Sequence, residues 1–248
     1  MHSILRFSWR AVALIIWLFI GLAILWFAFG FMSFTRQQRT IAWWSKGLIK
    51  GCQIQVQYLG RVPTQPVLFV LNHVSWLDIF VLNQQRATAF VAKKEIKRWP
   101  IVGSLVSKAG TIYIDRDQRH AIQQVVQQLE QKLQRNQAVG VFPEGKTSDG
   151  LHVQRFYSSL FAVALRTQIA IQPVALRFYD GAQRSGRIAF VGNQSLVRNA
   201  WYVLSKPHVR IECEFLSLWD YIDYKHHNRA VLAQQVHQQI SRAVLKGM

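Results

Sequence analysis

The sequence predicts an α/β fold, a mixed sheet flanked by helices, with a membrane-associated helical hairpin at the N-terminus. Two patterns favour this fold. Residues 1–51 hold one long apolar run followed by a basic segment that contains tryptophan. From residue 52 onward, short apolar runs separated by turn residues alternate with longer helical patterns, as in α/β domains. We therefore divide the chain into a membrane-anchoring segment, residues 1–51, and one folded domain, residues 52–248.

The apolar run covers residues 11–34 and contains no charged residue. A helix of this length is roughly 36 Å long, enough to cross a bilayer or to lie deeply in one. Arg6 and Arg10 precede the run, as in a cleaved signal peptide. However, the run is too long for the apolar core of a signal, and it does not end in small residues. The pattern favours a retained membrane helix, and hydropathy does not distinguish a spanning helix from one within a single leaflet.

The next segment, residues 35–61, is basic and carries Trp43 and Trp44 without any acidic residue. Tryptophan and cationic side chains anchor helices at a membrane interface. We therefore expect this segment to provide an interfacial helix, the second arm of the hairpin. Its cations are Arg36, Arg39, Lys46, Lys50 and Arg61.

Eight apolar runs predict the strands of the sheet. They fall near residues 54–59, 67–71, 88–92, 110–114, 138–142, 170–178, 187–191 and 208–215. The clearest helix is predicted at residues 118–136, where an apolar stripe that includes Ile122 crosses a glutamine-rich segment and Asp117 is placed to cap it. A final helix, from about residue 228 to residue 245, has a similar spacing and is expected to be a packing element.

The composition restricts the partners. The chain has 30 Lys and Arg against 12 Asp and Glu, a formal net charge of +18, and such an excess needs an anionic partner. Because the excess adjoins a membrane segment, anionic lipid headgroups and phosphorylated substrates are favoured over nucleic acid, for which no recognition-helix or zinc-finger spacing is present. Cys52 and Cys213 form neither a metal pattern nor a disulfide framework, so we expect buried thiols in a reducing compartment.

His73 and Asp78 lie in the otherwise apolar segment 72–78, and Asp78 is the first acidic residue of the chain. On a regular helix an offset of five residues turns through about 140° net, so the two side chains would not meet. We therefore expect His73 on a turn after the predicted strand 67–71 and Asp78 in the first turn of the next helix. A histidine oriented by a carboxylate can take a proton from a hydroxyl. The alternative is a capping box at residues 75–78 beside an ordinary loop histidine.

Residues 140–147 fit the nucleotide-binding pattern G-x-x-x-x-G-K-[ST]. A phosphate-binding loop needs backbone N–H groups and a helix that starts just after the lysine. Here Pro143 donates no N–H, Glu144 would repel phosphate, and the Ser-Asp-Gly that follows is typical of a turn. We favour a strand end that presents Glu144 beside the flexible Gly145, with Lys146 placed to meet an anion. An ordinary turn with solvated charges is the alternative.

A third group of charged residues surrounds the predicted strand at 110–114. Lys93 and Lys94 precede it, and Arg116 stands at its end. A guanidinium there could hold a phosphate in a two-pronged contact. The alternative is a salt bridge from Arg116 to a nearby carboxylate such as Asp115.

Together, and in this order, four segments resemble the motifs of the glycerolipid acyltransferase family. They are residues 72–78, residues 110–116, residues 142–145 (Phe-Pro-Glu-Gly) and residues 171–174 (Ile-Gln-Pro-Val). The resemblance covers roughly residues 35–215, and four ordered motifs are far more specific than any single one. This resemblance makes the capping-box and nucleotide-binding alternatives less favoured. It also predicts that residues 52–248 form an acyltransferase catalytic domain.

The resemblance implies that His73 acts as general base on a lysolipid hydroxyl while Asp78 holds the imidazole tautomer. The activated oxygen would attack an acyl thioester of coenzyme A or acyl carrier protein directly, making phosphatidic acid from 1-acylglycerol-3-phosphate for phospholipid synthesis. The resemblance implies no bound cofactor, and we expect no metal. The residues implied in binding the polar head of the acceptor are Arg116, Glu144, Gly145, Lys146, Lys93 and Lys94.

One departure bears on the acceptor. The family's third motif usually continues with Thr-Arg, whereas residues 146–150 read Lys-Thr-Ser-Asp-Gly, similar to relatives that acylate lyso-ornithine lipid. We favour 1-acylglycerol-3-phosphate because Lys146 and the basic excess suit a phosphate, with lyso-ornithine lipid as the alternative. The cytosolic thioester implies a catalytic domain on the cytoplasmic side of the bacterial inner membrane. Less favoured rivals are a P-loop NTPase and a basic, non-catalytic membrane-surface adaptor.

Overall fold

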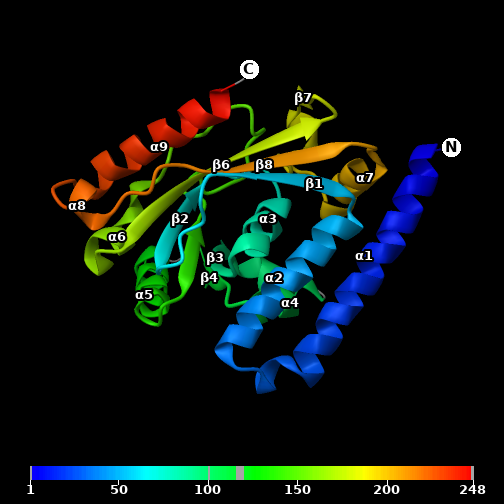
Figure 1. Cartoon of the computed structure of the whole chain (residues 1–248), viewed down its shortest axis with the longest axis horizontal. Helices are drawn as coiled ribbons and strands as arrows, with labels where there is room; N and C mark the ends of the chain where they lie inside the picture. Colours follow the sequence, from blue (N-terminus) through cyan, green and yellow to red (C-terminus); the bar gives the residue numbers. More distant parts are fainter. Residues whose placement is uncertain (1, 100, 116–119, 247–248) are drawn as a thin grey trace.

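A computed structural model describes residues 2–99, 101–115 and 120–246 of the chain, and eight strands are found within them. They are β1 Ile54–Leu59, β2 Val67–Leu71, β3 Thr88–Lys93, β4 Ile112–Ile114, β5 Ala138–Val141, β6 Ala170–Asp180, β7 Gln183–Arg184 and β8 Val209–Phe215. They form one sheet in the order β1-β8-β6-β2-β5-β3-β4, with β7 paired to β6 (Figure 1). The pairs β6-β2, β2-β5, β5-β3 and β3-β4 are parallel, whereas β8 is antiparallel to β6. The mixed sheet predicted from the sequence is confirmed.

Helices cover both faces of this sheet. The α-helices are α1 His2–Phe27, α2 Phe34–Gly51, α3 Leu77–Gln85, α4 Val102–Lys108, α5 Ala121–Gln134, α6 Ala162–Thr167, α7 Leu196–Ser205, α8 Tyr221–Tyr224 and α9 Arg229–Leu245. Short 3-10 turns are η1 Phe29–Phe31, η2 Lys94–Arg98, η3 Ser158–Phe161 and η4 Gly186–Ile188. One core cluster joins the sheet to α2, α3 and α7, and a second joins it to α5, α6 and α9. The domain therefore has three layers.

The central strand β2 shows why its sequence is an uninterrupted apolar run. Val67, Phe69 and Leu71 belong to the core cluster with α2 and α3, while Leu68 and Val70 belong to the cluster with α5 and α9. A strand with parallel neighbours and helices on both faces needs apolar residues on both faces. Each such side chain contributes roughly 1.5–3 kcal/mol when it leaves water. The polar residues that follow β2 are therefore attached to a rigid, buried strand.

The N-terminal hairpin is formed by α1 and α2, which run side by side (Figure 1). Trp17 donates its indole N–H to the carbonyl of Trp44 at 2.9 Å, and Trp44 donates in return to the carbonyl of Trp17 at 3.1 Å. A Cβ added at Gly47 would overlap the Trp17 ring, and a Cβ at Gly21 would lie 2.5 Å from Nε1 of Trp44. Each glycine therefore makes room for the tryptophan of the opposite helix.

Among the described residues, α1 is the one helix long and apolar enough to cross a bilayer. It starts before the uncharged run, at His2, and ends at Phe27. Only 11% of its most apolar stretch is buried inside the protein. The last turn of α2 differs, because Leu48 and Ile49 are each 2% exposed and belong to the core under the sheet. The predicted domain boundary between residues 51 and 52 is not tested by this packing and stays a prediction.

One predicted strand is wrong. Residues 187–191 form the end of η4 and an irregular segment, not a strand. The reason is where the backbone of Phe190 bonds: its N–H donates to the carbonyl of Val74, and its carbonyl accepts from the hydroxyl of Thr147. Both partners are in loops, so the apolar pattern of this segment reports burial between loops and not strand pairing.

The two predicted helices are present with different ends. The helix predicted at 118–136 is observed as α5, which begins at Ala121, and Asp117 lies outside the described residues. Ile122, assigned to its apolar stripe, is 39% exposed, so the buried stripe starts from Ala121 and Val125 instead. The final helix is α9, and Asn228 caps it by accepting backbone N–H groups of its first turn.

The two cysteines are far apart in sequence and are not joined. Cys52 and Cys213 are both free and buried, as predicted. Burial raises the pKa of the Cys52 thiol to about 12, and burial also raises the pKa of the Cys213 thiol. A thiol reacts as its thiolate. Both residues therefore serve as small apolar core residues at neutral pH.

Candidate active site

The predicted meeting of His73 and Asp78 is confirmed. The turn at residues 72–76 follows β2, and α3 begins at Leu77, so Asp78 lies in the first turn of the helix. Nδ1 of His73 lies 2.8 Å from Oδ2 of Asp78. A carboxylate at Nδ1 selects the tautomer that carries its proton there, and it leaves the lone pair of Nε2 to accept a proton.

Asp78 is held as firmly as the histidine. Its side chain is 0% exposed, and the same Oδ2 accepts backbone N–H groups from Val74 at 2.8 Å and from Ser75 at 3.0 Å. The bond from Ser75 is half of the alternative capping box. The other half differs, because Oγ of Ser75 accepts from the N–H of Leu77 at 3.4 Å. One carboxylate thus closes the turn and orients the imidazole.

The imidazole ring of His73 forms one end of an aromatic stack. Its centroid lies 4.0 Å from that of Phe142, with an interplanar angle of 18°, and Phe142 stacks in turn on Phe90 at 5.3 Å. The side chain of His73 is 21% exposed. The ring is therefore fixed by the carboxylate and the stack while part of it stays accessible to a substrate.

The backbone of the His73 turn is satisfied by other loops. Ser148 donates its N–H to the carbonyl of His73 at 2.7 Å, and Phe190 donates its N–H to the carbonyl of Val74 at 2.9 Å. Gly150 has φ +73°, and a Cβ there would lie 2.9 Å from the side chain of Val74. Because buried backbone groups need partners, the loops at 142–150 and 186–190 define where this turn lies.

Glu144 faces the same turn from inside the protein. Its side chain belongs to a residue that is 3% exposed; Oε1 accepts the N–H of His73 at 2.6 Å and Oε2 accepts the N–H of Gln154 at 2.8 Å. Burial raises the pKa of this carboxyl, although the two backbone hydrogen bonds and Ser148 oppose that shift. The sequence analysis predicted that Glu144 binds the polar head of the acceptor. In the structure both of its carboxylate oxygens accept backbone N–H groups instead.

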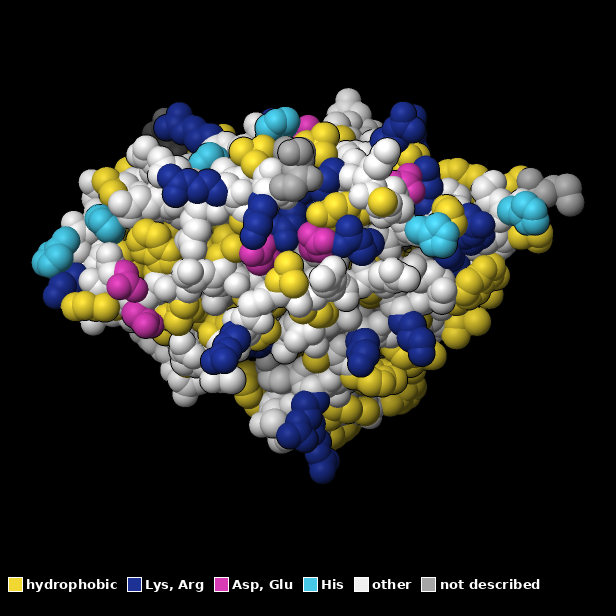
Figure 2. All heavy atoms as spheres, turned by 45° about the horizontal axis from the view of Figure 1, so that its top comes forward, with side chains coloured by type: hydrophobic (Ala, Val, Ile, Leu, Met, Phe, Trp, Pro, Cys, Tyr) yellow, Lys and Arg dark blue, Asp and Glu magenta, His cyan; other side chains and the backbone are white. Residues whose placement is uncertain are grey.

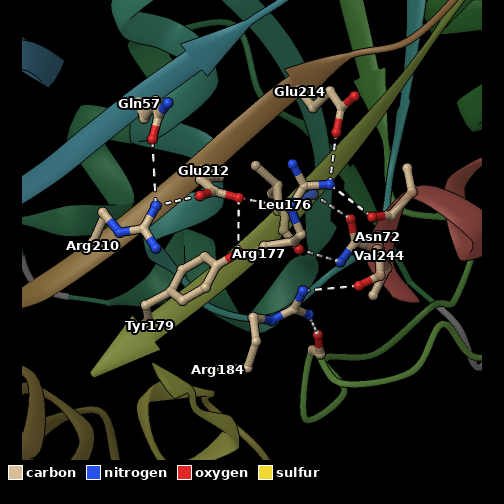
Figure 3. Close-up of polar contacts among 12 residues, drawn as sticks. Gln57, Asn72, Leu176, Arg177, Tyr179, Arg184, Arg210, Glu212, Glu214 and Val244 are labelled. Atoms are coloured by element: carbon tan, nitrogen blue, oxygen red, sulfur yellow. Dashed lines mark hydrogen bonds and ion pairs between the residues drawn. The ribbon is translucent and has the colours of Figure 1, made fainter. Parts of the chain in front are cut away.

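Asn72 fastens the other side of the turn to β6 (Figure 3). Its Nδ2 donates to the carbonyl of Leu176 at 3.0 Å, and its Oδ1 accepts the N–H of Leu176 at 2.7 Å. The next residue, Arg177, is 4% exposed and pairs with Glu212 at 2.9 Å and Glu214 at 2.6 Å. Figure 3 shows these bonds as one network across β6 and β8, so the strand that receives Asn72 is itself locked in place.

The predicted cations follow the carboxyl ends of neighbouring strands. Lys93 ends β3 and Lys146 follows β5, and both are exposed at the sheet edge where His73 follows β2. Lys94 is exposed and pairs with Asp115 at 2.9 Å. Arg116 lies outside the described residues. Ligands in α/β sheets bind outside the carboxyl ends of the strands, so this edge suits an anionic group.

Gly145 has φ +72°, a backbone conformation that side chains rarely adopt. A Cβ there would lie 3.4 Å from the Tyr157 ring. Tyr157 donates its N–H to the carbonyl of Pro143 at 2.9 Å. The glycine therefore supplies the tight turn between the buried Glu144 and the exposed Lys146.

Neither a nucleotide site nor a metal cluster is found in the described part of the chain. Residues 142–157 contain no helix, so the segment 140–147 lacks the helix N-terminus that a phosphate loop requires. No group of three or more His, Cys, Asp or Glu that could hold a metal ion occurs among the described residues. The fit of residues 140–147 to the nucleotide-binding pattern is therefore a coincidence of spacing.

An apolar cavity opens between the hairpin and the active site. It is lined by residues from α1, α2, α3, β3 and α4, among them Leu18, Ile41, Phe80, Phe90, Leu105 and Val106. Phe90 connects the two sites, because its ring stacks on Phe142, which stacks on His73. The cavity thus lies two aromatic rings away from the histidine.

Comparison with known proteins identifies the family. A family model described as Acyltransferase matches residues 53–177. The lyso-ornithine lipid O-acyltransferase of Pseudomonas aeruginosa is 32% identical over 208 residues, which cover 84% of this chain and 79% of that protein. This chain belongs to the acyltransferase family. The 1-acyl-sn-glycerol-3-phosphate acyltransferase of Neisseria gonorrhoeae is 33% identical over 212 residues, covering 84% of this chain and 82% of that one.

A solved structure shares the fold of this acyltransferase over its whole length. The crystal structure of the 1-acyl-sn-glycerophosphate acyltransferase of Thermotoga maritima superposes with a TM-score of 0.73 at 18% identity, covering 100% of this chain and 99% of that one. The N-terminal hairpin is thus part of a fold that is already known. All four segments that resemble family motifs lie within residues 53–177.

Sequence reasoning missed several residues that build the site of this acyltransferase. Ser148 and Phe190 hold the backbone of the His73 turn, and Asn72 joins it to β6. A polar residue directly after an apolar strand is a signal that could have singled out Asn72. No comparable signal marks Phe190, because its contribution is a backbone N–H.

Proposed function

We propose that this acyltransferase moves an acyl chain from an acyl thioester to the free hydroxyl of 1-acylglycerol-3-phosphate, making phosphatidic acid. The observation that carries the proposal is the 2.8 Å contact between His73 and the buried Asp78 at the carboxyl edge of the sheet. Relatives named for 1-acyl-sn-glycerol-3-phosphate acyl transfer support this acceptor. Relatives named lyso-ornithine lipid O-acyltransferase favour that lysolipid as the second candidate.

The proposed chemistry is a direct transfer. Nε2 of His73 takes the hydroxyl proton as the oxygen attacks the thioester carbonyl carbon and the C=O electrons move to oxygen. Asp78 stabilises the imidazolium without taking its proton. When the tetrahedral intermediate collapses, the C–S bond breaks and the thiolate receives the proton from His73. A general base of this kind is worth about 10²- to 10⁴-fold in rate.

Glu144 takes a different role from the one predicted from the sequence. With its carboxylate accepting the N–H of His73 and the N–H of Gln154, it orients the His73 turn and the loop opposite, and does not touch the acceptor. Positioning of this kind matters because misplacement by about 1 Å can cost about 10²-fold in rate.

The acceptor's polar head belongs at the exposed edge of the sheet. Lys146 and Lys93 are exposed there beside the ends of β5 and β3. We assign the phosphate to these lysines together with Lys94 and Arg116, with Gly145 shaping the loop. Compact ammonium groups suit a phosphate monoester. The headgroup of an ornithine lipid carries an ammonium group of its own and would need a carboxylate partner as well.

We assign part of the acyl chain of a substrate to the apolar cavity between the hairpin and His73, which at about 80 Å³ is too small to enclose a whole long chain. Its lining is formed by aliphatic and aromatic side chains of five elements, and burial of apolar surface is the general source of affinity in such sites. The rings of Phe90 and Phe142 stand between this cavity and His73.

We propose that the hairpin lies in one leaflet on the cytoplasmic side of the bacterial inner membrane. An outer stripe of α1 is exposed and apolar; it includes Leu5, Trp9, Val12, Ile16, Phe19 and Trp26. In Figure 2 hydrophobic side chains gather along the margin of the molecule where α1 lies in Figure 1. A spanning helix would have to leave the domain, yet buried Arg10 bonds to the carbonyls of Leu204 and Lys206 at 3.0 and 2.6 Å.

The second arm presents cations together with exposed aromatic rings, among them Trp43. Five of its exposed residues recur every three or four positions along α2, which places them on one face. They are Arg36, Arg39, Trp43, Lys46 and Lys50. Such a stripe attracts anionic lipids by about 1 kcal/mol per cation. Both arms together thus suit the surface of an anionic bilayer.

An acceptor panel tests the proposal. Purified full-length protein in vesicles receives palmitoyl-CoA or palmitoyl-acyl carrier protein with 1-acylglycerol-3-phosphate or lyso-ornithine lipid, and products are identified by mass spectrometry. We expect phosphatidic acid from the wild type and from His226→Ala, which changes an exposed histidine after α8. Product from lyso-ornithine lipid alone would establish the second candidate. Vesicle binding without turnover on any lysolipid would leave only a membrane-surface adaptor.

A further inference from the structure

Asn199 in α7 is a polar residue inside the core, far in sequence from every motif. It is 1% exposed. Its Oδ1 accepts the indole N–H of Trp76 at 2.9 Å, and its Nδ2 donates to the carbonyl of Ala189 at 3.0 Å. Longer bonds run from Nδ2 to the carbonyl of Ile188 and to Oε1 of Gln194, each at 3.3 Å. An indole only donates and a carbonyl only accepts, so these partners fix the orientation of the amide.

The first branch of this network reaches the catalytic pair through Trp76. Trp76 is the residue just before α3, between His73 and Asp78 in sequence. Its ring also meets Phe80 edge to face at 6.1 Å. Anchoring the indole therefore sets where α3 begins, and the first turn of α3 carries the carboxylate that orients the His73 ring.

The second branch reaches the same turn through residues 188–190. Asn199 binds the carbonyls of Ile188 and Ala189. The next residue, Phe190, donates its N–H to Val74 at 2.9 Å and accepts from the hydroxyl of Thr147. Phe190 thereby joins the His73 turn to the loop of Glu144. Both branches from one amide thus end on the loops that bear the reacting groups.

The helix that carries Asn199 is itself fixed at both ends. Ser195 caps its start by accepting the N–H of Arg198 at 3.2 Å. At its end, Arg6 donates to the carbonyl of Ser205 at 2.9 Å, and Arg10 binds the neighbouring carbonyls. Cations at a helix C-terminus also meet the negative end of the helix dipole. The first turns of α1 therefore hold α7 in place, and α7 gives Asn199 a rigid support.

We propose that Asn199 is a positioning residue for acyl transfer, one that sets the geometry of the His73–Asp78 pair through Trp76 and through residues 188–190; this rests on the proposed function. Buried and fully engaged with protein groups, Asn199 does not meet substrate. A residue of this kind affects the rate of the chemical step more than substrate binding, because a site placed with an error of about 1 Å can lose about 10²-fold in rate.

Three variants of the full-length protein test the proposal with palmitoyl-CoA and 1-acylglycerol-3-phosphate in vesicles. Asn199→Ala removes both branches, Asn199→Asp keeps the acceptor for Trp76 but places a buried carboxylate oxygen against the carbonyls of residues 188 and 189, and Trp76→Phe keeps a ring but loses the indole N–H. We expect kcat to fall by about tenfold to 100-fold in Asn199→Ala and at least as far in Asn199→Asp, and less in Trp76→Phe, with the KM of both substrates nearly unchanged. The melting temperature is measured for each.

Asn228→Ala is the matched control. It also removes an asparagine that makes two hydrogen bonds, at the start of α9, and we expect a lower melting temperature with unchanged kcat. Wild-type kcat in Asn199→Ala would overturn the proposal, as would an equal loss of kcat in Asn228→Ala at the same loss of melting temperature. If Asn199→Ala does not fold, wild-type kcat in Trp76→Phe overturns it. His73→Ala is measured in parallel, since its full activity would defeat the proposed function separately.

Discussion

The turn at His73 and the N-terminal hairpin differ in what mainly holds them together. Around His73, buried polar groups make most of the contacts, such as the pair with Asp78 and the bond that Glu144 accepts from the backbone N–H of His73. Between α1 and α2, tryptophan rings pack over glycines and two indole N–H groups bond across the pair, while the outer face of α1 is apolar and exposed. Hydrogen bonds between buried polar groups define a geometry closely, whereas apolar packing tolerates small shifts. Substitutions should therefore cost rate in the first region and membrane binding in the second.

Among the residues that act through His73, the largest effect is expected from Asp78→Asn. The amide can donate its N–H groups toward the imidazole and so favour the wrong tautomer, which lowers kcat by an amount that approaches the gain of about 10²- to 10⁴-fold supplied by the base itself. The measurement is thioester consumption under saturating substrates. Asp220→Asn, an exposed position before α8 where asparagine can also cap the helix, is the control and should keep its rate. A loss below threefold in Asp78→Asn would contradict the pairing.

Glu144→Gln should have a smaller effect on rate and a clear one on stability. One amide N–H group would face a backbone N–H, so a buried bond is lost, at a cost of about 1–3 kcal/mol in the free energy of unfolding. We expect kcat to fall by about tenfold to 100-fold. Urea unfolding and steady-state kinetics measure both quantities. A variant with unchanged stability and a raised KM for the acceptor would instead support the headgroup role predicted from the sequence.

The same residue predicts a pH dependence. Burial raises the pKa of Glu144 in the folded protein, so the folded state binds its proton more readily than the unfolded chain. Stability from this group therefore increases as pH falls from above the raised pKa toward the ordinary glutamate value, and it is lost as pH rises. The difference in unfolding free energy between wild type and Glu144→Gln should shift in favour of the wild type on acidification. A shift in the opposite direction would contradict the burial effect.

In the hairpin, Gly47→Val should lower stability and membrane binding without changing the chemistry. The added side chain overlaps the Trp17 ring, and overpacking of this kind costs about 1–3 kcal/mol. Co-sedimentation with vesicles and thermal unfolding measure the outcome. Gly30→Ala is the control, because nothing lies within 4 Å of a Cβ there. Equal behaviour of the two variants would show that the Trp17 contact does not hold the arms together.

The smallest effect is expected from the cationic stripe. The double variant Arg39→Gln and Lys46→Gln should weaken binding to vesicles that contain anionic lipid by about 2 kcal/mol in total, with less loss at high salt. Lys225→Gln, an exposed lysine after α8, serves as control. Unchanged binding to anionic vesicles would show that these cations of α2 do not contact the membrane surface.

Local patterns in the sequence were sufficient for the strand at Val67–Leu71, for the final helix that begins near residue 228 and for the meeting of His73 with Asp78. Each depends on neighbours within a few residues. The strand predicted at 187–191 was wrong because its apolar residues are buried by loops and not by strand pairing. The bond of Glu144 to the His73 turn and the bond of Asn199 to Trp76 could not be predicted, since each joins segments about 70 to 120 residues apart in sequence. Arg116 stays a prediction, because it lies outside the described residues.

The rate of thiol release from palmitoyl-CoA, in the presence of 1-acylglycerol-3-phosphate, tests the central claim most directly. His73→Ala is compared with His226→Ala at equal protein concentration and equal vesicle binding. We predict a fall of about 10²- to 10⁴-fold for His73→Ala and an unchanged rate for His226→Ala. Full activity of His73→Ala would contradict the claim that His73, oriented by Asp78, takes the proton from the acceptor hydroxyl.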